Sequence, residues 1–220
     1  MVDRFALGLP RRVPRDCQVT LFREPRLLTG FPDLVAVTWH VPTAERWTGR
    51  RLALTTNDLR VVQLLMSGGA STTERLRNLL RRNPESSMER LAAAGLVWER
   101  SGQWRVRRLK ESFAVRGIVA FEAKVSDWRR ALAQAANNRW FATESYILLP
   151  TLPGSRALLA EAPHHGVGVW VQGESVPALP APEQRAAQPL SFASWLLNEW
   201  SWRDAVHAGR LAAGSRACST

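Results

Sequence analysis

The feature that most constrains this chain is a short apolar run that ends in two charged residues. The run GIVAF, residues 117–121, is typical of a buried strand, and Glu122-Ala123-Lys124 follow it directly. Because side chains alternate along a strand, Glu122 and Lys124 are expected on one face and Ala123 on the other. Charges at the end of a core strand cost free energy to desolvate unless a partner or a cation compensates. The stretch therefore predicts a functional site.

The surrounding sequence alternates between strand patterns and helix patterns. Four further segments have the composition of strands, at residues 18–28, 33–39, 145–149 and 166–171. A turn at 29–32 makes the first two a plausible hairpin. Helices are expected over 128–141 and within 153–161. This order of elements predicts an α/β (α+β) fold.

Residues 55–108 have a different character. Three helical patterns are expected there, followed by a β-hairpin with its turn at Ser101-Gly102. The first helix is expected to be capped by Thr56 or Asn57, and the second by a capping box at residues 71–74. Three short helices and a hairpin closely resemble a winged helix-turn-helix. Residues 50–111 contain 13 basic and 6 acidic residues, so most of the net positive charge of the chain lies here.

The order of the elements and two short motifs together resemble the PD-(D/E)xK nuclease superfamily, which has the restriction-endonuclease-like fold. The motifs are Pro32-Asp33 and Glu122-Ala123-Lys124, the second followed by the expected helix and strand. The resemblance implies a mixed-sheet core made of two separated parts, with the winged helix-turn-helix inserted between them. The implied divisions are 1–50 and 111–172 for the core, 51–110 for the insertion, and 173–220 for a linker and a C-terminal amphipathic helix.

The resemblance also implies a reaction, the hydrolysis of phosphodiester bonds with Mg²⁺ or Mn²⁺ as the cofactor. Asp33 and Glu122 would be the carboxylate ligands, and the carbonyl of Ala123 would be a third oxygen. Lys124 would orient or deprotonate the attacking water and balance charge beside the phosphate.

Two further polar residues have alternative interpretations. Glu24 precedes Asp33 and is either a carboxylate for a second metal ion or a surface charge on an edge strand. Gln134, about two turns into the expected helix, either faces the site or a DNA backbone, or is an ordinary solvent-facing residue. The sequence leaves both alternatives open.

The composition favours a polyanionic partner, because the formal net charge is +11 at pH 7. Nucleic acid, and duplex DNA above all, is the expected partner. The third helix of the insertion carries one arginine suited to base reading, Arg90, so backbone contacts are expected rather than strong specificity. The arginines expected to bind DNA are Arg81, Arg82, Arg90, Arg100, Arg105, Arg107, Arg108, Arg129 and Arg130. Trp47 and Trp104 are candidates for stacking on bases.

The sequence predicts a cytoplasmic protein with no membrane partner. No run approaches the roughly 18 apolar residues of a membrane span, and the beginning has no signal-peptide pattern. Cys17 and Cys218 lack metal-ligand spacing and are expected to be free thiols. A homodimer is compatible with the sequence.

The leading hypothesis is a metal-dependent DNA endonuclease or nickase in which the winged helix grips duplex DNA. One alternative is a catalytically inactive DNA-binding or regulatory protein on a nuclease scaffold. Another is a nuclease directed to branched DNA or RNA. The net charge does not separate these functions, because all of their substrates are polyanions.

Overall fold

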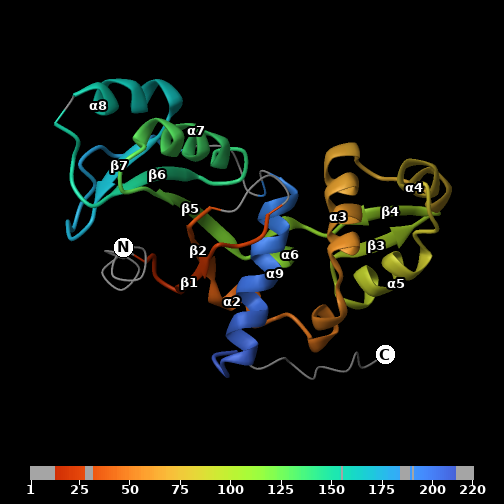
Figure 1. Ribbon diagram of the computed structural model, residues 1–220. Coiled ribbons are helices and arrows are strands. Elements are labelled where there is room, and N and C mark those ends of the chain that lie inside the picture. The colour runs from red at the N-terminus through yellow and green to blue at the C-terminus, as the bar shows by residue number, and fades with distance from the viewer. Residues whose placement is uncertain (1–12, 28–31, 155, 184–188, 190, 212–220) are drawn as a thin grey trace. The chain divides into compact units, whose positions relative to one another are not determined.

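The computed structural model describes residues 13–27, 32–154, 156–183, 189 and 191–211. The chain divides into two compact units, each built from separated segments (Figure 1). The sheet unit comprises Met1–Trp39 and Val115–Ser194, and the helical unit comprises His40–Ala114 and Trp195–Thr220. The expected turn at 29–32 falls mostly outside the described residues, as does Cys218. The mixed α/β class predicted from the sequence is confirmed.

Among the described residues, a five-stranded mixed sheet is the framework of the sheet unit. In spatial order its strands are β1 (Cys17–Arg23), β2 (Leu34–His40), β5 (Val115–Ala123), β6 (Glu144–Leu149) and β7 (Gly168–Val171). Strand β2 is antiparallel to β5, whereas β5, β6 and β7 are parallel. Strand β1 ends five residues before the predicted limit. Glu24 there has a left-handed backbone with φ 43°, and Pro25 has no N–H to donate.

The helices of this unit cover one face of the sheet (Figure 1). Helix α7 (Trp128–Asn138) connects β5 to β6, and α8 (Ala157–Glu161) with the 3₁₀ helix η2 (Ala162–His165) connects β6 to β7. The connection from β5 to β6 and the connection from β6 to β7 each move one strand along the sheet in the same direction. Because connections between parallel strands are right-handed, the helices of both connections lie on the same face of the sheet. The core between helices and sheet contains Ala131, Leu132, Ala135, Ile147, Leu149, Leu158, Ala162, Val167 and Val169. The opposite face carries the cluster Leu34, Phe121, Tyr146, Leu148 and Trp170.

Within residues 55–108 of the helical unit, the three predicted helices and the predicted hairpin are all present. The elements are α2 (Val41–Ala44), η1 (Gly49–Ala53), α3 (Thr56–Gly68), α4 (Thr73–Leu80), α5 (Glu85–Ala93), β3 (Val97–Arg100), β4 (Gln103–Val106), α6 (Leu109–Ser112) and α9 (Phe192–His207). The cap of α3 is Thr55 rather than the expected Thr56 or Asn57, because the Thr55 and Asp58 side chains each bind the other's backbone N–H. The short helices α2 and η1 were not predicted from the sequence.

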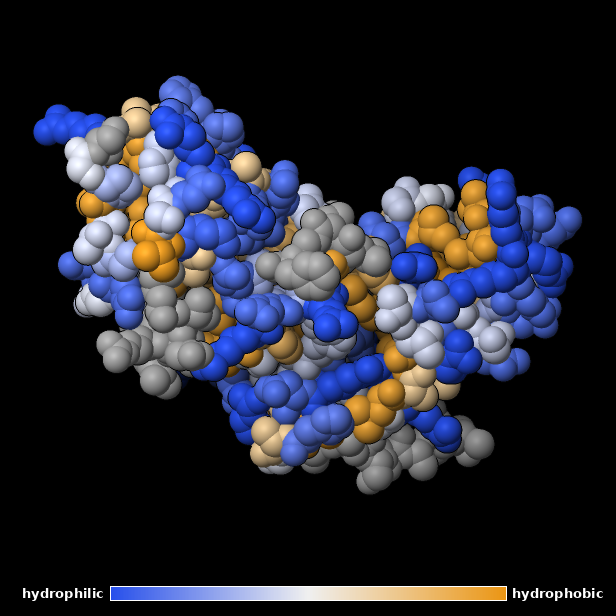
Figure 2. All heavy atoms as spheres, in the orientation of Figure 1, coloured by the Kyte–Doolittle hydropathy of each residue, from blue (hydrophilic) through white to orange (hydrophobic). Residues whose placement is uncertain are grey.

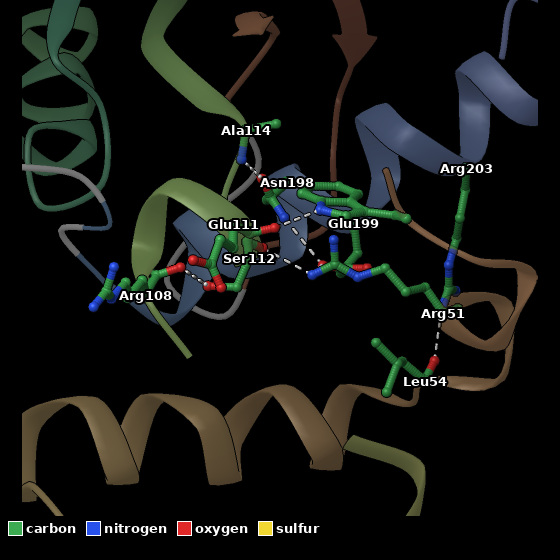
Figure 3. A network of polar contacts seen from close by, with 10 residues as sticks. Arg51, Leu54, Arg108, Glu111, Ser112, Ala114, Asn198, Glu199 and Arg203 are labelled. Atoms are coloured by element: carbon green, nitrogen blue, oxygen red, sulfur yellow. Dashed lines mark hydrogen bonds and ion pairs between the residues drawn. The ribbon is translucent and has the colours of Figure 1, made fainter. Parts of the chain in front are cut away.

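A buried ion pair joins the first and last parts of the helical unit (Figure 3). Arg51 Nη2 lies 3.1 Å from Glu199 Oε1, and both side chains are only 1% exposed. The same nitrogen donates to the Ser112 carbonyl, and Arg203 donates to the carbonyl of Arg51. Burial lowers the pKa of Arg51 to about 10 and raises that of Glu199, and the charge of each partner opposes the other's shift. The attraction between the two charged groups therefore compensates in part for the water that each group loses on burial.

Helix α9 differs from the amphipathic helix suggested by the sequence. Its residues from Phe192 to Trp202 are buried around almost the whole circumference, with Trp200 half-buried. Two of its polar residues are paired inside the protein instead of facing water. Asn198 Oδ1 accepts a hydrogen bond from the backbone N–H of Ala114 at 2.8 Å, and Glu199 is in the ion pair. In the sequence, buried polar residues of this kind cannot be distinguished from the polar residues of a solvent-exposed helix face, so the helix was predicted to be amphipathic.

Removing one partner of the buried pair is expected to destabilise the protein far more than breaking an exposed pair. Glu199→Ala leaves Arg51 charged and uncompensated, so the free energy of unfolding should fall by about 3 kcal/mol. Arg77→Ala is the matched control, since Arg77 Nη2 lies 3.2 Å from Glu85 Oε1 with both side chains largely exposed. That control should change stability by less than about 1 kcal/mol. Urea denaturation followed by tryptophan fluorescence measures both, and equal losses would contradict the expectation.

Candidate functional site

The sheet topology brings Asp33, Glu122 and Lys124 to the same edge. Strand β2 is antiparallel to β5 and Leu34 pairs with Phe121, so Asp33, just before β2, lies beside Glu122 near the end of β5. Residues paired across two strands point to the same face, which here is the face that α7 covers. The backbone N–H of Lys124 donates to the Leu148 carbonyl at 3.1 Å and extends the pairing with β6 by one residue. Two motifs 90 residues apart in sequence thus converge.

Asp33 is held through one of its two carboxylate oxygens. Oδ2 accepts a hydrogen bond of 2.7 Å from the backbone N–H of Ala123 and lies 3.6 Å from Nζ of Lys124. The side chains of Asp33 and Lys124 are 26% and 28% exposed, so solvent or a ligand reaches both. Both contacts fall on Oδ2, and no other described residue donates to the carboxylate. Oδ1 is therefore the oxygen that is available to a ligand.

Glu122 is held in the same manner but in a much drier environment. Its residue surface is only 3% exposed, and Oε1 accepts a hydrogen bond of 2.8 Å from the side-chain amide of Asn138 in α7. Oε2 is buried and has no hydrogen-bond partner among the described residues. The nearest cation, Lys124, contacts Asp33 instead. A buried carboxylate oxygen with neither a donor nor a directly bound cation is costly, and a ligand at this position would satisfy it.

Burial raises the pKa of Glu122 to about 7. The hydrogen bond from Asn138 opposes the shift, the negative charge of Asp33 adds to it, and the positive charge of Lys124 opposes it. At neutral pH the carboxyl group is consequently near the midpoint of its titration. A strongly shifted acid beside a second acid and a lysine is typical of functional sites.

The oxygen atoms at this edge fit a hard divalent cation. Asp33 Oδ1 and Glu122 Oε2 are carboxylate oxygens, and the carbonyl of Ala123, between Glu122 and Lys124, stays a predicted third ligand. In the described part of the chain, no three or more His, Cys, Asp or Glu side chains gather in a cluster. Mg²⁺ is commonly bound by one or two carboxylates and keeps several waters. Two carboxylates therefore fit that ion better than they fit a site with four protein ligands.

The two accessory residues have different surroundings. Gln134 is half-buried in α7, one turn before Asn138 and on the same side of the helix, and its Oε1 is buried without a partner among the described residues. This favours a Gln134 that faces the site over one that faces solvent. Glu24 is exposed, and its backbone N–H donates to the Asp33 carbonyl at 3.2 Å. It therefore adjoins Asp33 through its backbone, and an exposed carboxylate fits a surface charge.

Arg90 has a structural contact that the sequence did not reveal. Its Nε and Nη2 donate to both carboxylate oxygens of Asp58 at 2.9 and 2.8 Å, and Asp58 is fully buried. The guanidinium of Arg90 thus links α5 to the start of α3. This contact accounts for the position of the Arg90 side chain without a role in DNA binding. The exposed residues of α5 include Glu85, Ser86 and Glu89, which give this helix no basic face.

The remaining predicted arginines are exposed. Six belong to the helical unit and two begin α7: Arg81, Arg82, Arg100, Arg105, Arg107, Arg108, Arg129 and Arg130. Hydrophilic side chains dominate the surface around α4 and the β3–β4 hairpin (Figure 2). Trp47 is not available to stack on bases, since it is 6% exposed and donates to the Glu111 carbonyl at 2.7 Å. Trp104 is half-buried and donates to Thr73 Oγ1 at 3.0 Å.

Asn138 is the site residue that the sequence analysis missed. It lies 16 residues from Glu122 and belongs to no recognised motif. The available signal was spacing, because Gln134 and Asn138 are four residues apart among the alanines and leucine of the buried helix face. Two amides on an otherwise apolar face indicate that something polar lies opposite them.

Comparison with known proteins returned no match, whether with models of protein families, with curated proteins or with solved structures. Within the described ranges, none of the helices has the length and apolar character needed to cross a membrane. The functional assignment therefore rests on the geometry of the site and the charge of the surface.

The raised pKa of Glu122 predicts a specific dependence of stability on pH in metal-free buffer. A carboxyl group whose pKa rises from 4.5 to about 7 on folding stabilises the protein below pH 4.5 and loses that contribution as pH rises to 7. Glu122→Gln lacks this titration. Its stability relative to the parent should therefore increase by up to about 3 kcal/mol between those pH values, at about 1.4 kcal/mol per pKa unit. Urea denaturation with chelator across this range tests it, and a difference that is independent of pH would contradict it.

Proposed function

We propose that the protein is a metal-dependent DNA endonuclease or nickase with a restriction-endonuclease-like core. The supporting observation is the buried Oε2 of Glu122, without a partner among the described residues, beside the partly exposed pair of Asp33 and Lys124. In the structural ion pair of Arg51 and Glu199 the cation lies directly against the buried carboxylate, whereas Lys124 contacts Asp33 and leaves Glu122 without a bound cation. The mixed sheet also supports this core, since the two acids lie at the start of β2 and the end of β5, with α7 and β6 directly after.

Each residue has a distinct role in the proposed reaction. Asp33 Oδ1 and Glu122 Oε2 would hold a divalent cation, with the Ala123 carbonyl as the predicted third ligand. Mg²⁺, when bound, neutralises charge on the phosphate and acidifies water. The contact of Asp33 Oδ2 with the Ala123 N–H leaves Oδ1 as the oxygen for the cation. Lys124 is near enough to the same edge to hold the attacking water or a phosphate oxygen.

Binding of the substrate is assigned to the helical unit, which we interpret as a winged helix-turn-helix that grips duplex DNA. The exposed arginines of the hairpin and the segment after it suit phosphate contacts. The acidic residues on α5, and the engagement of Arg90 by Asp58, do not suit a helix that reads bases. The proposed grip therefore follows the backbone and carries little sequence preference.

A DNA-binding protein without catalysis is the second candidate. One observation favours it, which is that the described residues bring only two carboxylates to the site and no third acid. The two candidates share the DNA-binding surface and differ in whether the parent protein cleaves DNA when Mg²⁺ or Mn²⁺ is supplied.

Substitution of Lys124 separates the candidates. The parent is expected to nick supercoiled plasmid with Mg²⁺ or Mn²⁺ and not with chelator, and Lys124→Ala should lower the rate by about 100-fold or more. Affinity for DNA should change by less than about twofold, because the substitution leaves the helical unit intact. Lys110→Ala is the matched control, since Lys110 is the other lysine of the chain and is exposed in α6.

Failure to cleave with either metal, despite tight binding, would establish the second candidate. Equal rates in the parent and Lys124→Ala would place the reaction elsewhere. Competition among duplex DNA, branched DNA, single-stranded DNA and RNA then identifies the class of substrate.

Removing hairpin arginines is expected to weaken DNA binding through the salt-dependent part of the affinity. Arg105→Ala and Arg107→Ala together should lower the slope of log affinity against log salt by about 1 to 2. Arg116→Ala and Arg156→Ala together, at two exposed arginines of the sheet unit, remove the same amount of charge and should leave the slope unchanged. Fluorescence anisotropy with labelled duplexes at several salt concentrations measures the slopes. Equal effects at both places would show that the affinity follows net charge alone.

A further inference from the structure

The contact between Glu122 and Asn138 has features that stability does not explain. The amide nitrogen of Asn138 lies 2.8 Å from Oε1 of Glu122, and both residues are more than nine-tenths buried. The other buried residues of α7 are Ala131, Leu132 and Ala135. A buried pair of polar groups contributes little net stability compared with apolar groups of the same shape. The pair is therefore better explained by what it does to the carboxylate.

The hydrogen bond distinguishes the two oxygens of Glu122. The terminal torsion of a glutamate is broad, so a carboxylate without contacts exchanges its oxygens and samples many orientations. A donor fixed on α7 holds Oε1, and Oε2 is the oxygen that is left without a partner among the described residues. Asp33 shows the same arrangement, because the Ala123 N–H holds Oδ2. Each acid of the site thus has one anchored oxygen.

We propose that Asn138 is a positioning residue, which donates to Oε1 of Glu122 and so presents Oε2 to the divalent cation. This inference rests on the proposed function. Partners that orient a ligand in this way commonly contribute 10- to 100-fold to metal affinity. The other charged groups at Glu122 do not replace the contact, because Asp33 is an acceptor and Lys124 contacts Asp33.

Direct measurement of metal binding tests the inference without relying on cleavage. Mn²⁺ is titrated into the full chain, and the free ion is followed by electron paramagnetic resonance. Asn138→Ala and the nearly isosteric Asn138→Leu should both weaken binding by about 10- to 100-fold. Asn137→Ala is the matched control, since Asn137 is the exposed neighbour in the same helical turn, and it should bind within about twofold of the parent. Circular dichroism with chelator confirms that each variant is folded.

Cleavage at increasing Mn²⁺ gives a second readout that a purely structural residue would not change. The Asn138 variants should need more Mn²⁺ for half-maximal rate, and their maximal rate should return to within a few-fold of the parent. Unchanged Mn²⁺ affinity in both folded variants would overturn the positioning role and leave the proposed function standing. A parent protein that does not bind Mn²⁺ would overturn the proposed function, and the inference with it.

Discussion

The desolvation of the Glu122 carboxylate is the constraint on which the site depends. Strand β5 has to be apolar because it occupies the middle of the sheet. Glu122, near the end of this strand, is therefore only 3% exposed. The chain compensates for that burial in part, with one amide from α7 and the distant charge of Lys124, while Asp33 works against it. The raised pKa is the result of this incomplete compensation. A cation is the one addition that would satisfy Glu122 and Asp33 together.

A comparison with Glu199 shows that the protein handles buried acids in two ways. Glu199 is as deeply buried as Glu122, and each keeps one oxygen without a hydrogen-bond partner among the described residues. Glu199, however, is in direct contact with the Arg51 guanidinium at 3.1 Å. The cation nearest to Glu122 is drawn to Asp33 instead and stays partly exposed. A closed ion pair fits a role in the fold, whereas an acid that lacks its cation fits a role in binding.

The sequence predicted the elements that depend on local pattern and missed contacts that depend on distant residues. The sequence revealed the apolar run with Glu122 and Lys124, the strands and the longer helices of both units, because periodicity and caps are local, whereas the short helices α2, η1 and α6 were not predicted. The engagement of Arg90 by Asp58 joins residues 32 apart, and the contact of Asn138 with Glu122 joins residues 16 apart. The same limit hid the burial of Trp47 and of α9. Polarity in a sequence shows that a residue needs a partner, and it does not show whether that partner is water, protein or ligand.

This limit also changes what the net charge of +11 means. Arg51 and Arg90 are tied to buried acids, and Arg203 donates to backbone carbonyls, so these arginines serve the interior. More of the exposed, described arginines belong to the helical unit than to the sheet unit. A polyanion senses the exposed charges far more than the buried, paired ones. The exposed positive charge that a polyanion would sense therefore lies mainly on the helical unit. Asp33, Glu122 and Lys124 all belong to the sheet unit. In the proposed function, affinity for DNA therefore comes mainly from the helical unit and turnover from the sheet unit.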